Sequence, residues 1–330
     1  MDELIAQYLP AALSAWFVLL IAWLAEKTIP VASWVDPIGF FRFVCERMAK
    51  KVLPRSQQTQ QHYISGALAV IVLIAPVLLC VFLIREFAYY PLIFDALIIY
   101  LCLQFTPYAK LTEQCHKALN ADKKQLAKSL LNPSTLRQTG SLSSTGLIKA
   151  TIEMFCLRIV YQQIVVMFWY LALGPIAVLF YRLCYEAHQS WNTKIDTFQA
   201  FGWFSHWVCF LFQYVPVRCF ALLLHTVASL QNIGRRTATK SLPMSYPKAT
   251  FWQSNGGVIL GALSGAINRT TSGPVKYHSS HNGTVKIRRV KFLGRSEPLI
   301  TDILLSTRLC NHTIIAFMWV LLLCCWVFSL

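Results

Sequence analysis

The chain has 330 residues, of which 56% are hydrophobic and only 13% are charged. Soluble domains usually carry about 25% charged residues, so this composition excludes an ordinary water-facing globule. It also excludes intrinsic disorder, because the chain has ample apolar surface to bury. We therefore predict an all-α, multi-pass membrane protein that forms a single integral-membrane domain over residues 1–330.

The charges are strongly unbalanced, with 30 Lys and Arg against 14 Asp and Glu and a formal net charge of +16. In a soluble protein this excess would indicate nucleic-acid binding. In a membrane protein, basic loops mark the cytoplasmic side and face anionic lipid. We therefore predict the lipid bilayer and its anionic inner leaflet as partners, and no nucleic acid.

A helix needs about 20 apolar residues to cross the hydrocarbon core. Six stretches are predicted to do so: Ile5–Ala25, Ile64–Ile84, Phe87–Phe105, Met154–Phe180, Phe201–Leu230 and Ile314–Leu330. The N-terminus lacks the basic region of a cleaved signal peptide, so the first stretch is predicted to stay as an anchor. Gly256–Ala266 is apolar but too short to span, which indicates a re-entrant or buried segment.

The orientation follows from the loops. Basic residues concentrate in 26–63, 106–149 and 234–300, whereas the alternate connections are nearly neutral. With six alternating spans the three basic loops lie on one side, which the positive-inside rule assigns to the cytoplasm. We predict a bacterial inner-membrane protein with both termini in the periplasm.

Two loop helices are predicted. An apolar face recurs at helical spacing beside basic residues and indicates an amphipathic helix on the inner leaflet. That face consists of Phe41, Val44, Cys45, Met48 and Val52. A second helix is predicted over Leu111–Leu131, ending before Asn132-Pro133.

Ionisable groups inside spans are costly and therefore mark candidate sites. They are Asp95, Glu153 with Arg158, Tyr181-Arg182, His206 and Arg218. The structural alternative is that the groups near the interfaces extend to water, and that Arg218 only accompanies the kink at Pro216. His278 and His281 are too few ligands for a metal, and the 11 cysteines form no CxxC pair, so no metal site is predicted.

A series of short motifs runs in order through more than half of the chain. The motifs are Lys149 to Glu153, Gly174-Pro175, Tyr181-Arg182, Tyr214 to Arg218, Gly261-Ala262-Leu263, Gly273-Pro274 with Tyr277, Gly294, and Asp302 with Arg308. Together they resemble the CobD/CbiB cobalamin-biosynthesis superfamily. The resemblance implies an integral membrane fold. The family's enzymes, the adenosylcobinamide-phosphate synthases, join cobyric acid to aminopropanol or its phosphate with ATP and magnesium.

The chain departs from this pattern at the family's acids. After the glutamate matched by Glu153, the enzymes carry an acidic A-E-N-T-x-D-G run, where this chain reads Cys156 to Gln162. Their N-T-L-D becomes Tyr185 to His188, their paired aspartates before P-x-R become Cys209-Phe210, and the acid before G-A-L-G becomes Gly256. Because magnesium prefers carboxylate oxygens, these replacements should remove metal binding.

The chain is therefore predicted to be a non-catalytic member that acts as a regulatory or sensing partner of a membrane or cytoplasmic protein. This role is that of the AmpE proteins, which look similar in Phe155, Arg158, Phe168, Trp169 and Tyr214 to Arg218. The alternative is an active ligase with relocated acids, which would then need ATP and magnesium. A transporter is a third reading, based on Asp95, Arg158 and the kinks at Pro76 and Pro216.

No catalytic residue is predicted. The candidate ligand-site residues, implied by the resemblance and by their charge, are expected to meet near one polar pocket. They are Glu153, Arg158, Tyr181, Arg182, Tyr214, Arg218, Tyr277, Asp302 and Arg308. The predicted topology sets Arg182 towards the outside and Asp302 inside, so either the fourth span is re-entrant or the two groups serve different roles.

Overall fold

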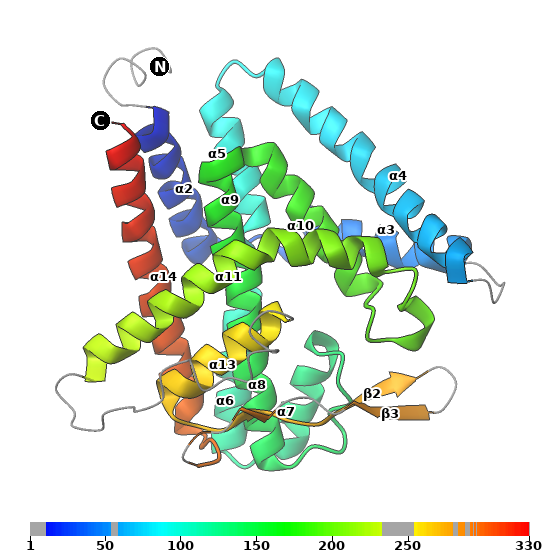
Figure 1. Cartoon of the computed structure of the whole chain (residues 1–330), viewed down its shortest axis with the longest axis vertical. Coiled ribbons are helices and arrows are strands. Elements are labelled where there is room, and N and C mark those ends of the chain that lie inside the picture. Colours follow the sequence, from blue (N-terminus) through cyan, green and yellow to red (C-terminus); the bar gives the residue numbers. More distant parts are fainter. Residues whose placement is uncertain are drawn as a thin grey trace. The chain divides into compact units, whose positions relative to one another are not determined.

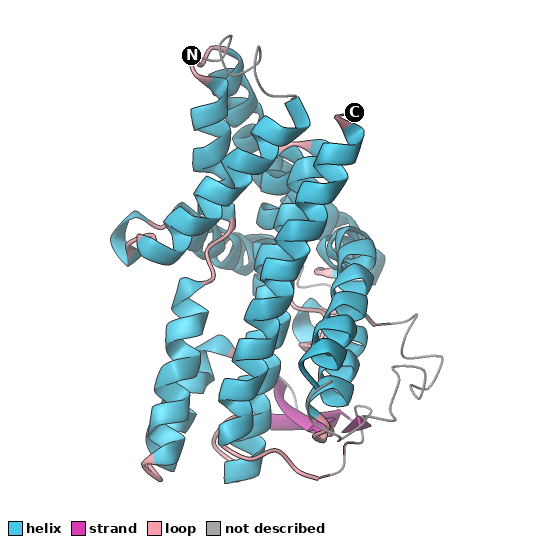
Figure 2. Ribbon diagram, turned by 90° about the vertical axis from the view of Figure 1, so that its left-hand side faces the viewer, coloured by secondary structure: helices cyan, strands magenta, loops and turns pink. Residues whose placement is uncertain are grey.

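The computed structural model describes residues 11–53, 59–232, 254–279, 283–287, 291–292, 294 and 296–329. Within these residues the chain is almost entirely helical, with four short strands between residues 271 and 292 (Figure 2). The predicted all-α class is confirmed. The chain folds as two compact units, the first from residues 1–104, 165–213 and 320–330 and the second from residues 105–164 and 214–319.

Five described helical stretches are long and apolar enough to cross a membrane. They are Thr59–Glu86, Pro91–Asn120, Ser144–Leu173, Trp203–Gln231 and Thr301–Val327. The predicted first span begins at Ile5, outside the described residues, and its described part is helix α2, Ala11–Thr28. The multi-pass membrane class predicted from composition is confirmed.

In its described residues the first unit is built from six helices, the start of a seventh and the end of an eighth (Figure 1). They are α2, α3 (Pro37–Val52), α4 (Thr59–Glu86), α5 (Pro91–Cys102), α9 (Val165–Leu173), α10 (Pro175–Ser190), the first part of α11 (Trp203–Asn232) and the last part of α14 (Thr301–Phe328), with 3₁₀ turns at Ser33–Val35 and Asp196–Phe198. Helix α10 packs against α3, α4, α5 and α9, so it is the centre of this unit.

Helix α3 has the amphipathic character predicted for it. Asp36 caps its N-terminus by accepting a hydrogen bond from the Ile38 N–H at 3.1 Å. Phe41 and Cys45 are buried, whereas Phe40 on another face is 68% exposed. Burial of one face is what keeps a helix of this length in place.

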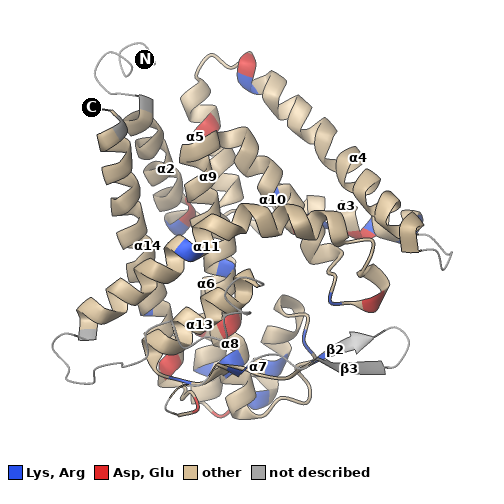
Figure 3. Ribbon diagram, viewed as in Figure 1, with Lys and Arg blue, Asp and Glu red and all other residues tan. Residues whose placement is uncertain are grey.

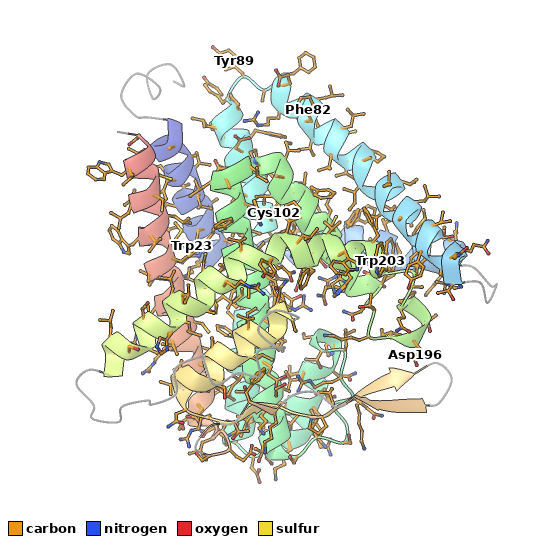
Figure 4. All side chains as sticks on the ribbon, viewed as in Figure 1. Trp23, Phe82, Tyr89, Cys102, Asp196 and Trp203 are labelled. Carbon is orange, nitrogen blue, oxygen red and sulfur yellow. The ribbon has the colours of Figure 1, made fainter. Side chains whose placement is uncertain are left out.

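Helix α4 is the most apolar of the five candidate spans and carries no charged residue before Arg85 (Figure 3). Only 17% of its most apolar window is buried within the chain. Phe82 near its end and Tyr89 in the following turn point away from the helices and are exposed (Figure 4). This outward apolar surface fits a hydrocarbon environment. Gly66 is required on its packed side, because a Cβ there would lie 1.9 Å from the Phe201 carbonyl oxygen.

The second unit is centred on α8, which packs against α6, α7 and α13. Its helices are α6 (Thr106–Asn120), α7 (Lys124–Leu131), α8 (Ser144–Ile159), a π-helical segment (Val160–Ile164), the second part of α11, α13 (Asn255–Ile267) and the first part of α14 (Thr301–Phe328), with a 3₁₀ turn at Asn132–Ser134. Two antiparallel strand pairs complete it: β1 (Thr271–Ser272) with β4 (Lys291–Phe292), and β2 (Val275–Ser279) with β3 (Gly283–Ile287).

The predicted fourth span, Met154–Phe180, is wrong at both ends. The helix begins at Ser144, where the Ser143 hydroxyl caps it by accepting from the Gly146 N–H, and it ends at Leu173. Gly174 has φ of 82° and Pro175 begins α10. The apolar pattern is therefore continuous across a point where one helix ends and the next begins. Arg182 therefore belongs to a separate helix.

The single helix predicted over Leu111–Leu131 is also wrong, because it is two helices. Asp122 adopts the left-handed conformation with φ of 54°, and the Lys123 N–H then bonds the Ala118 carbonyl at 2.8 Å. This is the local geometry that ends a helix.

The boundaries of other predicted elements differ as well. The last helix begins at Thr301 rather than Ile314, and the candidate span from Pro91 continues to Asn120, into the predicted 106–149 loop. The short apolar stretch Gly256–Ala266 lies within α13 (Asn255–Ile267) and is largely buried. This agrees with the buried alternative of the prediction that it is a re-entrant or buried segment.

Candidate functional site

Glu153 on α8 is a buried acid whose two oxygens are both engaged. One accepts a hydrogen bond from the Arg137 guanidinium in an ion pair. The other accepts from the backbone N–H of Ser272 at 3.0 Å. Ser272 and Gly273 both have positive φ, which makes the turn between β1 and β2 strained. Glu153 stabilises this turn through its hydrogen bond from the Ser272 N–H. The carboxylate is a structural acceptor in this arrangement.

Arg158 lies one turn further along α8 and is half-buried. Its guanidinium carbon is 4.7 Å from the centre of the Tyr108 ring on α6. This is the geometry of a cation–π contact, which stabilises a partly buried arginine.

Tyr214 and Arg218 act together on α11. The Arg218 guanidinium stacks 3.4 Å from the Tyr214 ring centre and donates to the Tyr214 carbonyl at 2.7 Å. It also donates to Asn255 Oδ1 at 3.1 Å, the first residue of α13. Arg218 thereby joins helix α11, which contains Pro216, to the N-terminus of α13, whose cap is Ser254.

The same end of α13 faces α8. A Cβ built at Gly256 would lie 3.4 Å from the Tyr161 hydroxyl and 3.6 Å from Leu157 Cδ2. Leu157, Tyr161 and Gly256 are three positions at which the resemblance implies acids in the ligases. They are neighbours in space although Gly256 is far from the other two in sequence. Leucine, tyrosine and glycine do not fit magnesium, which binds carboxylate and carbonyl oxygens.

Asp302 is the second residue of α14 and is buried. Its Oδ2 accepts a hydrogen bond from the Leu299 N–H at 2.7 Å and forms an ion pair with Arg269 Nε at 2.9 Å. These contacts are those of a helix cap with a charged partner. Arg308 is exposed on the same helix, and the side chain of Tyr277 in β2 lies outside the described residues.

Tyr181 and Arg182 belong to the first unit. Arg182 is 2% exposed and its Nη1 donates to Glu186 Oε1 at 2.5 Å, one turn along α10. Glu186 is fully buried, and its other oxygen accepts from Arg42 Nε of α3 at 2.7 Å. One carboxylate thus links two arginines, as buried charges require. The Tyr181 hydroxyl accepts from Gln213 Nε2 at 3.2 Å.

Other titratable groups around α10 are shifted away from reactivity. Burial raises the pKa of the Cys45 and Cys184 thiols to about 12, so both stay protonated. His188, where the resemblance implies an aspartate, lies 5.1 Å from the His206 ring. Burial, with smaller effects of His206 and Lys194, lowers the pKa of His188 to about 3, which keeps it neutral.

The structure groups the predicted residues into several local networks. Asp95, considered above as a charge inside a span, accepts two hydrogen bonds from Arg85 at 2.6 and 2.9 Å, across the turn between α4 and α5. Arg42, Arg85 and Arg137 were absent from the sequence-based set. Arg85 is 10 residues from its partner Asp95. Arg137 and Arg42 are 16 and 144 residues from their partners Glu153 and Glu186, so helical periodicity could not predict those two pairs.

In the part of the chain that the structure describes, no group of three or more His, Cys, Asp or Glu side chains is arranged to hold a metal ion. Four of the five buried acids among the described residues, Glu153, Glu186, Asp95 and Asp302, each form an ion pair with an arginine, and the fifth is Glu26 on α2. The four paired acids therefore work mainly as anchors for basic side chains and backbone.

Comparison with known proteins gives a consistent picture. The family model described as CobD/CbiB protein matches residues 19–294. The cobalamin biosynthesis protein CobD of Chromobacterium violaceum is 26% identical over 247 residues, covering 74% of this chain and 77% of that protein. Proteins of the same name from Stutzerimonas stutzeri (27% identity; 46% of this chain and 48% of that protein) and Mycobacterium tuberculosis (26%; 60% and 61%) also match. No solved structure matches significantly.

Proposed function

The chain belongs to the CobD/CbiB family, and from that premise we propose that it is a membrane protein which does not carry out the family's ligation. It acts instead as a regulatory or sensing partner of another protein, in the manner of the AmpE-like branch. The observation that carries this proposal is the trio Leu157, Tyr161 and Gly256. The positions converge, but their side chains offer magnesium no carboxylate.

The remaining acids support the same reading. An ATP-dependent ligase must hold metal against phosphates with carboxylates that are open to the metal. Glu153 is engaged by Arg137 and Ser272, and Glu186 by Arg42 and Arg182. Removing Glu186 from Arg182 would leave a buried positive charge, which is costly. Removing Glu153 from Arg137 would break an ion pair in which both side chains are largely shielded from water.

The membrane setting forms part of the proposal. Lys and Arg gather around α6, α7 and α8 in the second unit (Figure 3). A surface of this sign suits the anionic lipid of a cytoplasmic leaflet. We place the basic loops 26–63, 106–149 and 234–300 in the cytoplasm of a bacterium and both termini in the periplasm, as the positive-inside rule favours.

An active adenosylcobinamide-phosphate synthase is the second candidate. It is favoured by the relatives, all of which are named cobalamin biosynthesis protein CobD. It would require Glu153, Glu186 or Asp302 to leave its arginine and bind magnesium. The transporter reading loses its main support, because Asp95 is paired with Arg85.

Complementation separates the two candidates. The chain is expressed in a bacterial strain that lacks the ligase, with a family ligase as positive control and membrane immunoblots to verify expression. We expect no restoration of cobalamin-dependent growth. Restored growth at comparable expression would overturn the proposal in favour of the ligase.

A gain-of-function variant tests the trio directly. Leu157→Glu, Tyr161→Asp and Gly256→Asp together return acids to three neighbouring positions, with Leu157→Gln, Tyr161→Asn and Gly256→Asn as the uncharged control. We expect Mn²⁺, followed by electron paramagnetic resonance, to bind the acidic variant and neither the control nor the native protein. Binding to the native protein would contradict the proposal, and no binding to the acidic variant would contradict the assignment of the trio.

A further inference from the structure

The candidate span Ser144–Leu173 is interrupted by the π-helical segment Val160–Ile164. Such segments are rare and are frequently found at functional sites. This one contains two consecutive glutamines, Gln162 and Gln163, which are 0% and 1% exposed. Gln162 stands where the resembling ligases carry glycine, so its amide is a departure of this chain from the pattern.

Both amides are buried without a partner. The oxygen and nitrogen of Gln162 and of Gln163 make no hydrogen bond to any residue that the structure describes. The two amides also make no hydrogen bond to each other. A buried amide normally has a protein or water partner, and leaving one unpaired is more costly in a membrane interior than near water.

Gln213 provides the contrast within the same chain. It is also buried, at 6% exposure, but its Nε2 donates to the Tyr181 hydroxyl at 3.2 Å. The chain therefore pairs this buried glutamine within the protein. Gln162 and Gln163 lie in the π-helical segment, and each has an amide that can donate and accept hydrogen bonds. Neither amide has a hydrogen-bond partner among the described residues.

We propose that the π-helical segment is a polar binding site inside the chain, in which Gln162 and Gln163 hold a small neutral guest by hydrogen bonds. The guest must both donate and accept, because each amide offers an N–H₂ group and a carbonyl oxygen. Water meets this requirement, and so does a small molecule with a hydroxyl or amide group. A buried water needs two to four polar partners, which two amides supply.

Water-edited solid-state NMR of the full chain in lipid nanodiscs, with ¹⁵N-labelled glutamine side chains, tests this site. Gln162→Met and Gln163→Met assign the two signals, and Gln213 serves as the buried control that has a protein partner. We expect Gln162 and Gln163 to receive magnetisation from bound water, or from the protons of a small molecule that mass spectrometry then finds in an extract of the denatured protein. Two amides with neither contact would overturn the proposal.

Thermal unfolding of the same variants gives a second readout. Methionine keeps the length of glutamine and removes its polar atoms. If a guest is bound, Gln162→Met and Gln163→Met lose its hydrogen bonds and lower Tm by a few degrees, as Gln213→Met does. If the amides are unpaired, the same changes remove a buried polar group and raise Tm, which would contradict the site.

Discussion

Glu153 in the second unit and Glu186 in the first are both buried acids on helices, yet they differ in what they hold. Glu153 shares its charge between one arginine and a backbone N–H of the Ser272 turn. Glu186 gives each of its oxygens to an arginine, Arg42 and Arg182. Glu153 positions a strained turn, and Glu186 compensates the charge of the buried Arg182. Both acids are paired with arginine in this structure.

The largest effect is expected where the buried charge is most isolated from water. Glu186→Ala leaves Arg182 buried without its counter-ion, and we expect it to lower the free energy of unfolding by about 3–5 kcal/mol. Glu46→Ala, on the exposed face of α3, is the matched control and should leave it nearly unchanged. Thermal unfolding in nanodiscs measures the stability of both variants. Equal losses would contradict the claim that Glu186 stabilises the fold by pairing with the buried Arg182.

A smaller effect is expected at Glu153. Glu153→Gln retains an acceptor for the Ser272 N–H but loses the charge that holds Arg137, which should cost about 1.5–3 kcal/mol. Combining it with Arg137→Met should cost less than the sum of the single changes, because the two share one interaction. Additive losses would mean that the ion pair does not hold the turn. Glu113→Gln, in an exposed pair with Lys117, is the control and should have no measurable effect.

The smallest effect concerns pH and only the first unit. The pKa of His188 is lowered from 6.5 to about 3, so the folded state prefers the neutral ring. Well above pH 6.5 folded and unfolded states bind the same number of protons at this site. As pH falls towards and below 6.5, the unfolded state takes up a proton that the folded state does not bind, which should cost about 1.4 kcal/mol between pH 8 and pH 5.5.

Unfolding scans between pH 8 and pH 5.5 measure this loss. His188→Gln removes the titrating ring, so its curve should fall less steeply than that of the native chain. Parallel curves would show that His188 contributes no proton linkage.

Sequence reasoning recovered the features that depend on composition and short-range periodicity. The membrane class, the buried Phe41 and Cys45 face of α3 and the helix from Trp203 all follow from apolar spacing. The ends at Gly174 and Asp122 were missed, because a single positive φ interrupts a pattern that remains apolar or amphipathic on both sides. Amino-acid composition and hydrophobic periodicity, on which the predicted bounds were based, do not report such a dihedral angle.

The candidate site was recovered less completely. Tyr214 and Arg218 pair as their spacing on one helix allows, and Arg158 is balanced by an aromatic ring. The partners of Glu153 and Glu186 were not predictable, since Arg42 lies 144 residues from Glu186 and periodicity describes only neighbouring turns. The meeting of Gly256 with Leu157 and Tyr161 likewise depends on tertiary packing. The convergence of all nine candidate residues on one pocket stays a prediction.

The central claim is that this family member lacks ligase activity. Purified protein in nanodiscs, incubated with cobyric acid, aminopropanol or its phosphate, ATP and magnesium, is assayed for the amide product by mass spectrometry beside a family ligase. The account predicts that the ligase forms the product and this chain does not. Amide formation by this chain above background, dependent on both ATP and magnesium, would contradict it.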